Sequence, residues 1–135
     1  MQYGQLPKVL LHEHLDGSLR IGTILDLASR YGYHHLPSAD PDALADWFDQ
    51  SESASLEHYL ESFRHTLAVM QTAEAIERVA FESLVDLATD GVVYAEIRFA
   101  PSLCTAGGLS RRQVVDAALV GLREAERATG IDSRL

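Results

Sequence analysis

The chain has 135 residues, of which 47% are hydrophobic, and this composition is typical of a water-soluble chain of about one globular domain. Its formal net charge of −9 disfavours nucleic acid as a partner, because an acidic surface repels polyanions, whereas a small neutral ligand is compatible with it. No apolar run approaches the length of a membrane span, and residues 1–8 lack the pattern of a secretory signal.

The first predicted strand covers residues 8–14 and runs into the sequence His-Glu-His-Leu-Asp-Gly-Ser-Leu-Arg. Because side chains alternate along an extended chain, His12, His14 and Asp16 are expected on one face. The Cα atoms of His12 and His14 would lie about 6.8 Å apart. At that separation both imidazoles can bind one Zn²⁺ at Zn–N distances of about 2.0–2.1 Å. Asp16 would lie about 13 Å from His12 on a fully extended chain and is expected to face a ligand bound above the metal.

A structural role for these three side chains stays open on spacing alone. Histidines at the end of an apolar run are often hydrogen-bonded residues at the rim of a core. Against this, burying two imidazoles and a carboxylate costs several kcal/mol unless something pairs them. Two histidines also do not complete a zinc site, which needs three or four protein ligands, and the neighbouring sequence offers no others.

The next predicted elements are helical. Gly17 allows a bend and Ser18 is expected to cap a helix over 20–31 that ends at Gly32, and a proline-containing loop over 33–41 precedes one or two helical turns over 42–49. Apolar residues then recur at steps of three and four, which predicts an amphipathic helix that Ser55 could cap; they are Leu56, Tyr59, Leu60, Phe63, Leu67 and Met70. A second long helix is predicted over 72–90, ended by Asp90-Gly91.

A second strand is predicted over 92–101, with Glu96 and Arg98 on one face as either functional charges or a structural ion pair. Cys104 has no His or Cys neighbour, so it is expected to be an ordinary loop or buried thiol. As the only cysteine it cannot form an internal disulfide, which favours the cytoplasm. Ser110 is expected to cap a helix to Thr129, after which the pattern requires another strand. Alternating strands and helices indicate a parallel α/β fold, here an incomplete domain.

Three segments carry a resemblance to a known family. His12–Arg20 resembles the first-strand metal motif of the adenosine deaminase family, within the zinc-dependent amidohydrolase barrels. Residues 91–101 resemble the second-strand signature of the family, and residues 55–71 resemble its substrate-covering helical segment. The resemblance extends over essentially all of residues 1–135 and is strongest to bacterial members. It implies an incomplete (β/α)8 TIM-type barrel, with the first two to three β/α units of a single domain.

The resemblance also implies roles for individual residues. His12 and His14 would be two ligands of one Zn²⁺, His14 would also lie close to the substrate, and Asp16 would hydrogen-bond the ribose of a purine nucleoside. Leu56, Tyr59 and Phe63 match the apolar lid over the purine, although ordinary core-facing positions explain them equally well. The remaining metal ligands and the glutamate that acts as general acid are expected beyond Leu135, so no residue of this segment is assigned as the general acid.

The implied reaction is hydrolytic removal of ammonia from C6 of adenosine or 2′-deoxyadenosine, with a water activated by zinc, and the chain alone is expected to be inactive. One alternative is a related deaminase of adenine or of an N6-substituted purine, in which the residue at the Asp16 position tends to differ. Another alternative is a non-catalytic fragment that binds a partner through its open sheet edge. The sequence does not indicate the oligomeric state.

Other histidine arrangements do not form a metal site. His58 and His65 lie on nearly one helix face, but about 10.5 Å apart along the axis, which is too far to share one ion. His34 and His35 fall in a polar loop and are expected to be solvated. The zinc site of cytidine deaminases is excluded because it needs more than the single cysteine present.

Overall fold

The computed structural model describes residues 6–49 and 55–135. Strands and helices follow one another in the order β1 (Lys8–His14), the 3-10 helix η2 (Leu15–Gly17), α1 (Ile21–Tyr31), α2 (Pro41–Phe48), α3 (Leu56–Val69), α4 (Ala73–Thr89), β2 (Val92–Arg98), the 3-10 helix η3 (Pro101–Cys104), α5 (Arg111–Thr129) and β3 (Asp132–Arg134). No helix in these two ranges is long and apolar enough to cross a bilayer.

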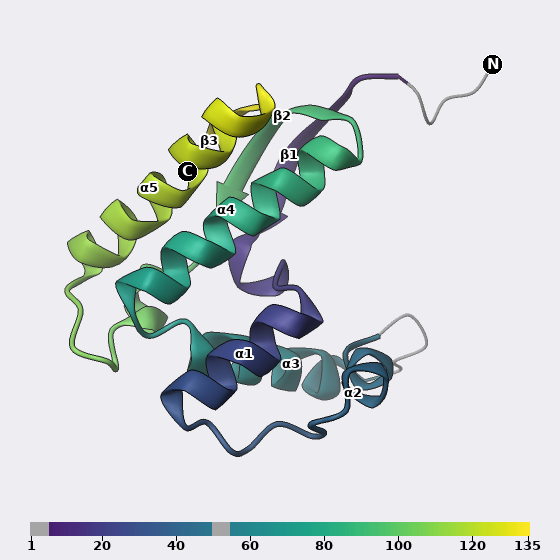
Figure 1. Ribbon diagram of the computed structural model, residues 1–135, viewed down its shortest axis with the longest axis vertical. Coiled ribbons are helices and arrows are strands. Elements are labelled where there is room, and N and C mark those ends of the chain that lie inside the picture. The colour runs from purple at the N-terminus through teal and green to yellow at the C-terminus, as the bar shows by residue number, and fades with distance from the viewer. Residues whose placement is uncertain (1–5, 50–54) are drawn as a thin grey trace.

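The three strands form one parallel sheet in the order β1-β2-β3. Helices α4 and α5 lie side by side over one face of this sheet, and α1, α2 and α3 gather beyond the carboxyl ends of the strands (Figure 1). On the other face, Val9 and Leu11 are 59% and 58% exposed. The parallel α/β arrangement predicted from the sequence is therefore confirmed, with the helices of the β/α units on one side only.

Most helix ends follow the predicted capping residues. The Ser110 hydroxyl accepts a hydrogen bond from the backbone N–H of Gln113, and the Gln113 side chain accepts one from the backbone N–H of Ser110, which forms a capping box. Gly130 ends α5 with a left-handed backbone at φ 79°. The prediction that Ser18 caps α1 is wrong, because the helix begins at Ile21 and no side chain caps it.

Two strand predictions need correction. The second strand ends at Arg98 and not at 101, because η3 begins with Pro101, a residue that fits the first turn of a helix. The sequence pattern placed the next strand after residue 135. In the structure this strand is already present over Asp132–Arg134, where it pairs with Tyr94 to Glu96 of β2. The described residues therefore contain three parallel strands.

The hydrophobic core lies between the sheet and the pair α4–α5, and small residues let these two helices approach closely. A Cβ atom built on Gly121 of α5 would lie only 2.1 Å from the Glu77 carbonyl oxygen of α4. The face of α4 that packs here is apolar, with Ile76, Val79, Ala80 and Leu84 all buried. The thiol of Cys104 is also buried here, and this burial raises its pKa to about 11.

Helix α3 buries a different face from the one that its apolar spacing predicted. Leu56, Tyr59 and Leu60 are 71%, 47% and 56% exposed, so the amino-terminal half of the predicted stripe points outward. The buried face carries polar residues together with Val69, namely Ser62, His65 and Thr66. Burial is tolerated because each polar group has a hydrogen-bond partner: Ser62 and Thr66 donate to carbonyls of their own helix, and His65 contacts the Tyr33 hydroxyl.

Candidate functional site

His12 and His14 come together at the carboxyl end of β1, as the alternation along the strand predicts. Their Nε2 atoms are 3.1 Å apart, and their ring centroids are 5.1 Å apart. Two nitrogens bound to one tetrahedral zinc at about 2.0–2.1 Å would be separated by about 3.3 Å, so the pair fits a shared metal. The His14 side chain is 51% exposed, which leaves the pair accessible.

Asp16 does not continue the strand, because the strand ends at His14 and the chain turns into η2. Its Oδ1 is 3.6 Å from Nδ1 of His14, the ring nitrogen opposite the one that faces His12. The Asp16 side chain is 9% exposed, and Oδ1 has no hydrogen-bond partner. Burial raises the Asp16 pKa, and the nearby His14 opposes this shift. A buried acceptor without a partner is costly, so this carboxylate is suited to bind a ligand donor.

The turn that carries Asp16 is fixed by hydrogen bonds on both sides. The Ser18 hydroxyl lies 2.5 Å from Oε1 of Glu13 and 2.7 Å from the carbonyl oxygen of His14. Leu15 is fully buried in the core. Gly17 packs against Phe63, since a Cβ atom at Gly17 would lie 3.5 Å from its ring. Ser18, which the sequence predicted to cap a helix, therefore closes the turn instead.

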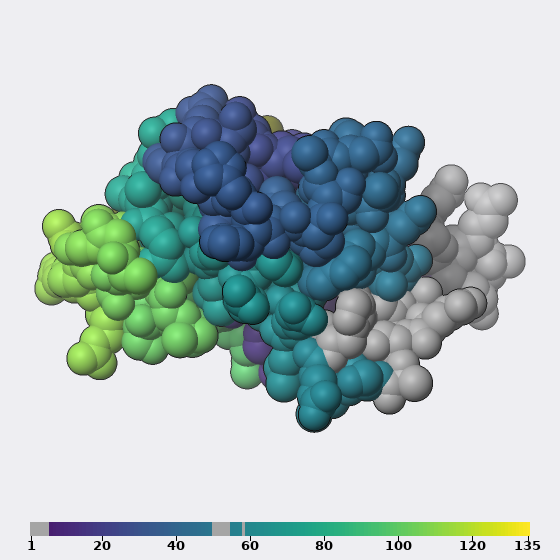
Figure 2. Space-filling view, turned by 90° about the horizontal axis from the view of Figure 1, so that it is seen from below, coloured from purple at the N-terminus to yellow at the C-terminus, as the bar shows by residue number. Residues whose placement is uncertain are grey.

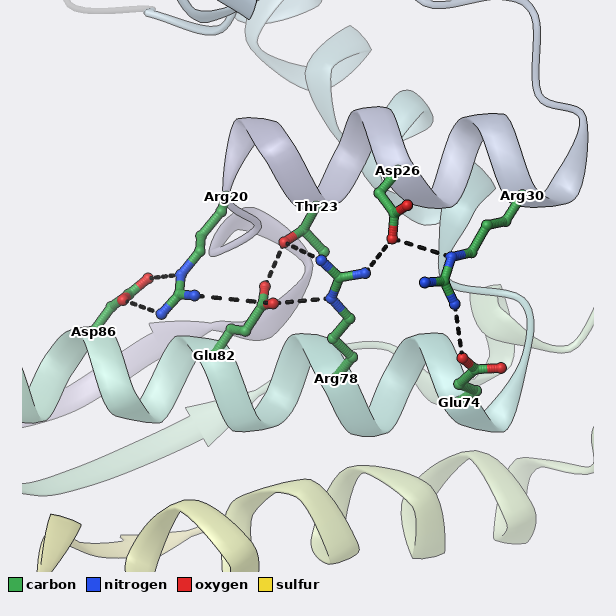
Figure 3. Close-up of polar contacts among 8 residues, drawn as sticks. All are labelled: Arg20, Thr23, Asp26, Arg30, Glu74, Arg78, Glu82 and Asp86. Atoms are coloured by element: carbon green, nitrogen blue, oxygen red, sulfur yellow. Dashed lines mark hydrogen bonds and ion pairs between the residues drawn. The ribbon is translucent and has the colours of Figure 1, made fainter. Parts of the chain in front are cut away.

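A ladder of charged side chains then attaches α1 to α4 (Figure 3). Arg20, the residue before α1, donates two hydrogen bonds to Asp86, at 2.9 and 2.6 Å. Glu82, only 13% exposed, accepts from the Thr23 hydroxyl at 2.5 Å and from Arg78 at 2.9 Å. The other rungs are Arg78 with Asp26, Asp26 with Arg30, and Arg30 with Glu74. The ladder thus holds the segment that follows Asp16 against the helix that covers the sheet.

Asp16 faces a cavity of about 220 Å³ between η2, α1, α2 and α3. Its walls are Asp16, Gly17, Leu19, Ile21, Ile24, Phe48, Tyr59, Ser62, Phe63 and Thr66. The space-filling view from this end of the molecule shows the surfaces of α1, α2 and α3 next to one another (Figure 2). Of the residues matched to the purine lid, Tyr59 and Phe63 line the cavity, with their rings in edge contact at 5.4 Å, whereas Leu56 does not.

Sequence reasoning missed the contribution of α2 and α1 to this cavity. Phe48 lies far from the histidine motif along the chain, and Ile24 lies only a few residues after it, but no motif marks either residue. Glu96 and Arg98 do not form the expected ion pair in the described contacts, and Glu96 accepts instead from the Tyr94 hydroxyl at 3.1 Å. In residues 6–49 and 55–135 no group of three His, Cys, Asp or Glu side chains is placed to hold a metal. The described residues therefore bring together one pair of candidate ligands, His12 and His14, without a third.

Comparison with solved structures defines the class of fold. A zinc-bound amidohydrolase from Burkholderia ambifaria superposes with a TM-score of 0.80 at 29% identity, over 98% of this chain and 35% of that protein. An adenine deaminase from Arthrobacter aurescens gives 0.81 at 28% identity, over 94% of this chain and 38% of that protein. An N6-methyl-AMP deaminase from Arabidopsis gives 0.66 at 27% identity. The three strands and their helices are thus part of an amidohydrolase TIM-type barrel.

The sequence comparisons then specify the family. The adenosine deaminase family model matches residues 7–135, and the chain therefore belongs to the adenosine deaminase family. An adenosine deaminase of Mycobacterium tuberculosis is 58% identical over 129 residues, and one of Mycobacterium avium is 54% identical over 134 residues. The chain spans 35% and 37% of the lengths of these two relatives. The resemblance inferred from the motifs is confirmed.

Proposed function

We propose that this chain forms the first part of the active site of a zinc-dependent adenosine deaminase, which converts adenosine or 2′-deoxyadenosine to the inosine product and ammonia. The observation that carries the proposal is the convergence of His12 and His14 beside the buried, unpartnered carboxylate of Asp16. Barrels of this fold place their reacting groups at the carboxyl ends of the strands. The two histidines and the carboxylate of Asp16 lie at that end of β1. The cytoplasm, favoured by the single cysteine, stays a prediction.

In this proposal, each residue has a separate task. His12 and His14 would hold one Zn²⁺ through their Nε2 atoms, and the ion would supply the Lewis-acid activation of water that hydrolysis at C6 of the purine needs. Asp16 accepts a hydrogen bond from a ribose hydroxyl and so fixes the sugar relative to the histidines. Phe63 and Tyr59 cover the base, and the ring centroids of Phe63 and His14 lie 6.4 Å apart in an edge-to-face arrangement. The general acid and the other ligands lie outside these 135 residues.

The nucleoside is preferred over other purines for two reasons. The relatives at 54–58% identity are named adenosine deaminases, whereas the adenine and N6-methyl-AMP deaminases match at 27–28%. In addition, Asp16 offers an acceptor that a free base without a sugar would leave unpaired. Adenine and N6-methyl-AMP are therefore the substrates against which adenosine must be compared.

The test joins this chain to the carboxyl-terminal two thirds of the Mycobacterium tuberculosis relative and measures adenosine turnover by ultraviolet absorbance. The chimera is expected to deaminate adenosine when zinc is supplied, and His12→Ala or His14→Ala is expected to remove the activity and the bound zinc together. Asp16→Asn is expected to raise KM for adenosine more than for adenine. His34→Ala, in an exposed loop, is the matched control.

The outcomes separate the alternatives. Faster turnover of adenine or N6-methyl-AMP than of adenosine would favour the related purine deaminases. Full activity of the His12→Ala or His14→Ala chimera would refute the assignment of the metal pair. Turnover by the 135-residue chain alone at an ordinary enzymatic rate would contradict the expectation that it lacks the general acid.

A further inference from the structure

His65 is a buried histidine of α3, whereas the metal pair lies on β1. It is 4% exposed and lies on the buried face of α3 with Ser62 and Thr66. In the described contacts, the ring partners of His65 are the aromatic side chains of Tyr33 and Trp47. This position gives His65 a structural link to the walls of the cavity.

Three segments meet at the imidazole of His65. The hydroxyl of Tyr33, in the loop after α1, lies 2.8 Å from Nδ1. The ring of Trp47 in α2 stands at right angles to the imidazole, with the centroids 5.2 Å apart. If Tyr33 donates its proton, Nδ1 accepts it, so the neutral ring carries its own proton on Nε2. His65 therefore joins α3 to both the loop and α2.

The same contacts lead to the cavity beside Asp16. Trp47 packs edge to face on Phe48, with centroids 5.1 Å apart, and Phe48 lines the cavity. Ser62 and Thr66, which flank His65 on the buried face of α3, line it as well. A shift of α2 away from His65 would thus move the Phe48 wall.

We propose that His65 is a positioning residue of the ligand cavity: in its neutral form it holds α2 through Trp47, so that Phe48 closes the cavity, and a proton on His65 releases this wall. Its effect on nucleoside binding rests on the proposed function. The test below needs no ligand, so a failure here is distinguishable from a failure of the deaminase assignment.

The charges around His65 determine the sign of the pH dependence. Burial is the main cause that lowers the His65 pKa; Arg64 on α3 and His35 in the loop lower it further, and Glu61 on α3 opposes them. From α2 the contact is the uncharged indole of Trp47. The closed arrangement is therefore fully stable above the pKa of a solvated histidine, about 6.5. It loses stability as the pH falls below that value, until the pH reaches the lowered pKa of the closed form.

Trp47 is the only tryptophan, so its fluorescence reports on this contact directly. We expect the emission of the 135-residue chain to change between pH 7.5 and 5 while the far-ultraviolet circular dichroism stays constant. Over the same range, hydrogen exchange should show a loss of protection in α2, by at most about tenfold per pH unit once the intrinsic exchange rate is divided out. His65→Gln, whose amide oxygen can still accept from Tyr33, should keep α2 protected at pH 5.

His34→Gln is the matched control, because His34 is exposed and its removal should leave both transitions in place. Nitrogen-15 spectra of the unmodified chain give a measurement that does not depend on any variant folding. They should show His65 protonated on Nε2 at pH 7 and titrating with the same midpoint as the Trp47 signal. Constant α2 protection from pH 7.5 to 5, a transition retained in His65→Gln, or a His65 midpoint different from that of Trp47 would overturn the proposal.

Discussion

The closest approach of α4 and α5 gives a stability prediction whose size follows from the structure. In Gly121→Ala the new Cβ would lie 2.1 Å from the Glu77 carbonyl oxygen and 2.9 Å from the Ala80 Cβ. Ordinary contacts of a carbon atom lie near 3.5 Å, so α5 would have to retreat by about 1.4 Å. The backbone carbonyl of Glu77 cannot rotate away, because it belongs to the helix itself.

Two effects of opposite sign compete in this substitution. Replacing glycine by alanine inside a helix stabilises it by up to about 1 kcal/mol. Overpacking of a dense core costs about 1–3 kcal/mol or more, and here the displacement would also loosen the buried contacts along the whole α4–α5 interface. We expect the overpacking to dominate and Gly121→Ala to lower the free energy of unfolding by about 2 kcal/mol.

Gly22 in α1 supplies the matched control, because the space around its missing side chain is empty to 4 Å. Gly22→Ala should therefore raise the free energy of unfolding by several tenths of a kcal/mol up to about 1 kcal/mol. Urea titrations followed by circular dichroism at 222 nm measure both values. A Gly121→Ala chain as stable as the parent chain would refute the close packing of α4 against α5.

Three further predictions concern buried or paired polar groups. The Ser83 hydroxyl is buried without a partner, so Ser83→Ala should raise the free energy of unfolding by about 1 kcal/mol in urea titration, and a loss of stability would reveal a hydrogen bond absent from the structure. Glu82→Gln removes the charge of a 13% exposed carboxylate that binds Arg78 and Thr23, and it should lower the free energy of unfolding by about 1–2 kcal/mol, measured by thermal unfolding. Arg112→Gln is the control and should change nothing measurable, because the Arg112 side chain is 90% exposed in its ion pair. Cys104, with its pKa raised to about 11, should resist a thiol reagent at pH 8 until the chain unfolds, and rapid labelling of the folded chain would contradict its burial. Its contribution to the free energy of unfolding should be lost as the pH rises from about 9 towards 11.

The parts of the fold that depend on local rules could be predicted from the sequence. Alternation along the strand was enough to place His12 and His14 together, because β1 is extended through both residues. The end of α5 followed from Gly130, the residue type that best adopts a left-handed backbone. Family motifs added the barrel, which no periodicity could have indicated.

The remaining features depend on contacts between distant segments. Asp16 lies on η2 and not on an extended chain, and nothing in the local pattern marks a turn of three residues. The buried face of α3 was missed because Ser62 and Thr66 satisfy their hydroxyls within the helix and so are buried like apolar residues. The ladder between α1 and α4 joins residues up to 66 positions apart, which no sequence spacing reveals.

We propose that His12 and His14 hold one divalent cation while Asp16 stays free for the ligand. Imidazole nitrogen-15 spectra of the chain, recorded while zinc is added, test it most directly, since each histidine has its own pair of nitrogen signals. We expect the Nε2 signals of His12 and His14 to shift together at low zinc, with the exposed His34 unchanged. Binding that shifts neither residue, or that persists in the double variant His12→Ala with His14→Ala, would contradict the account.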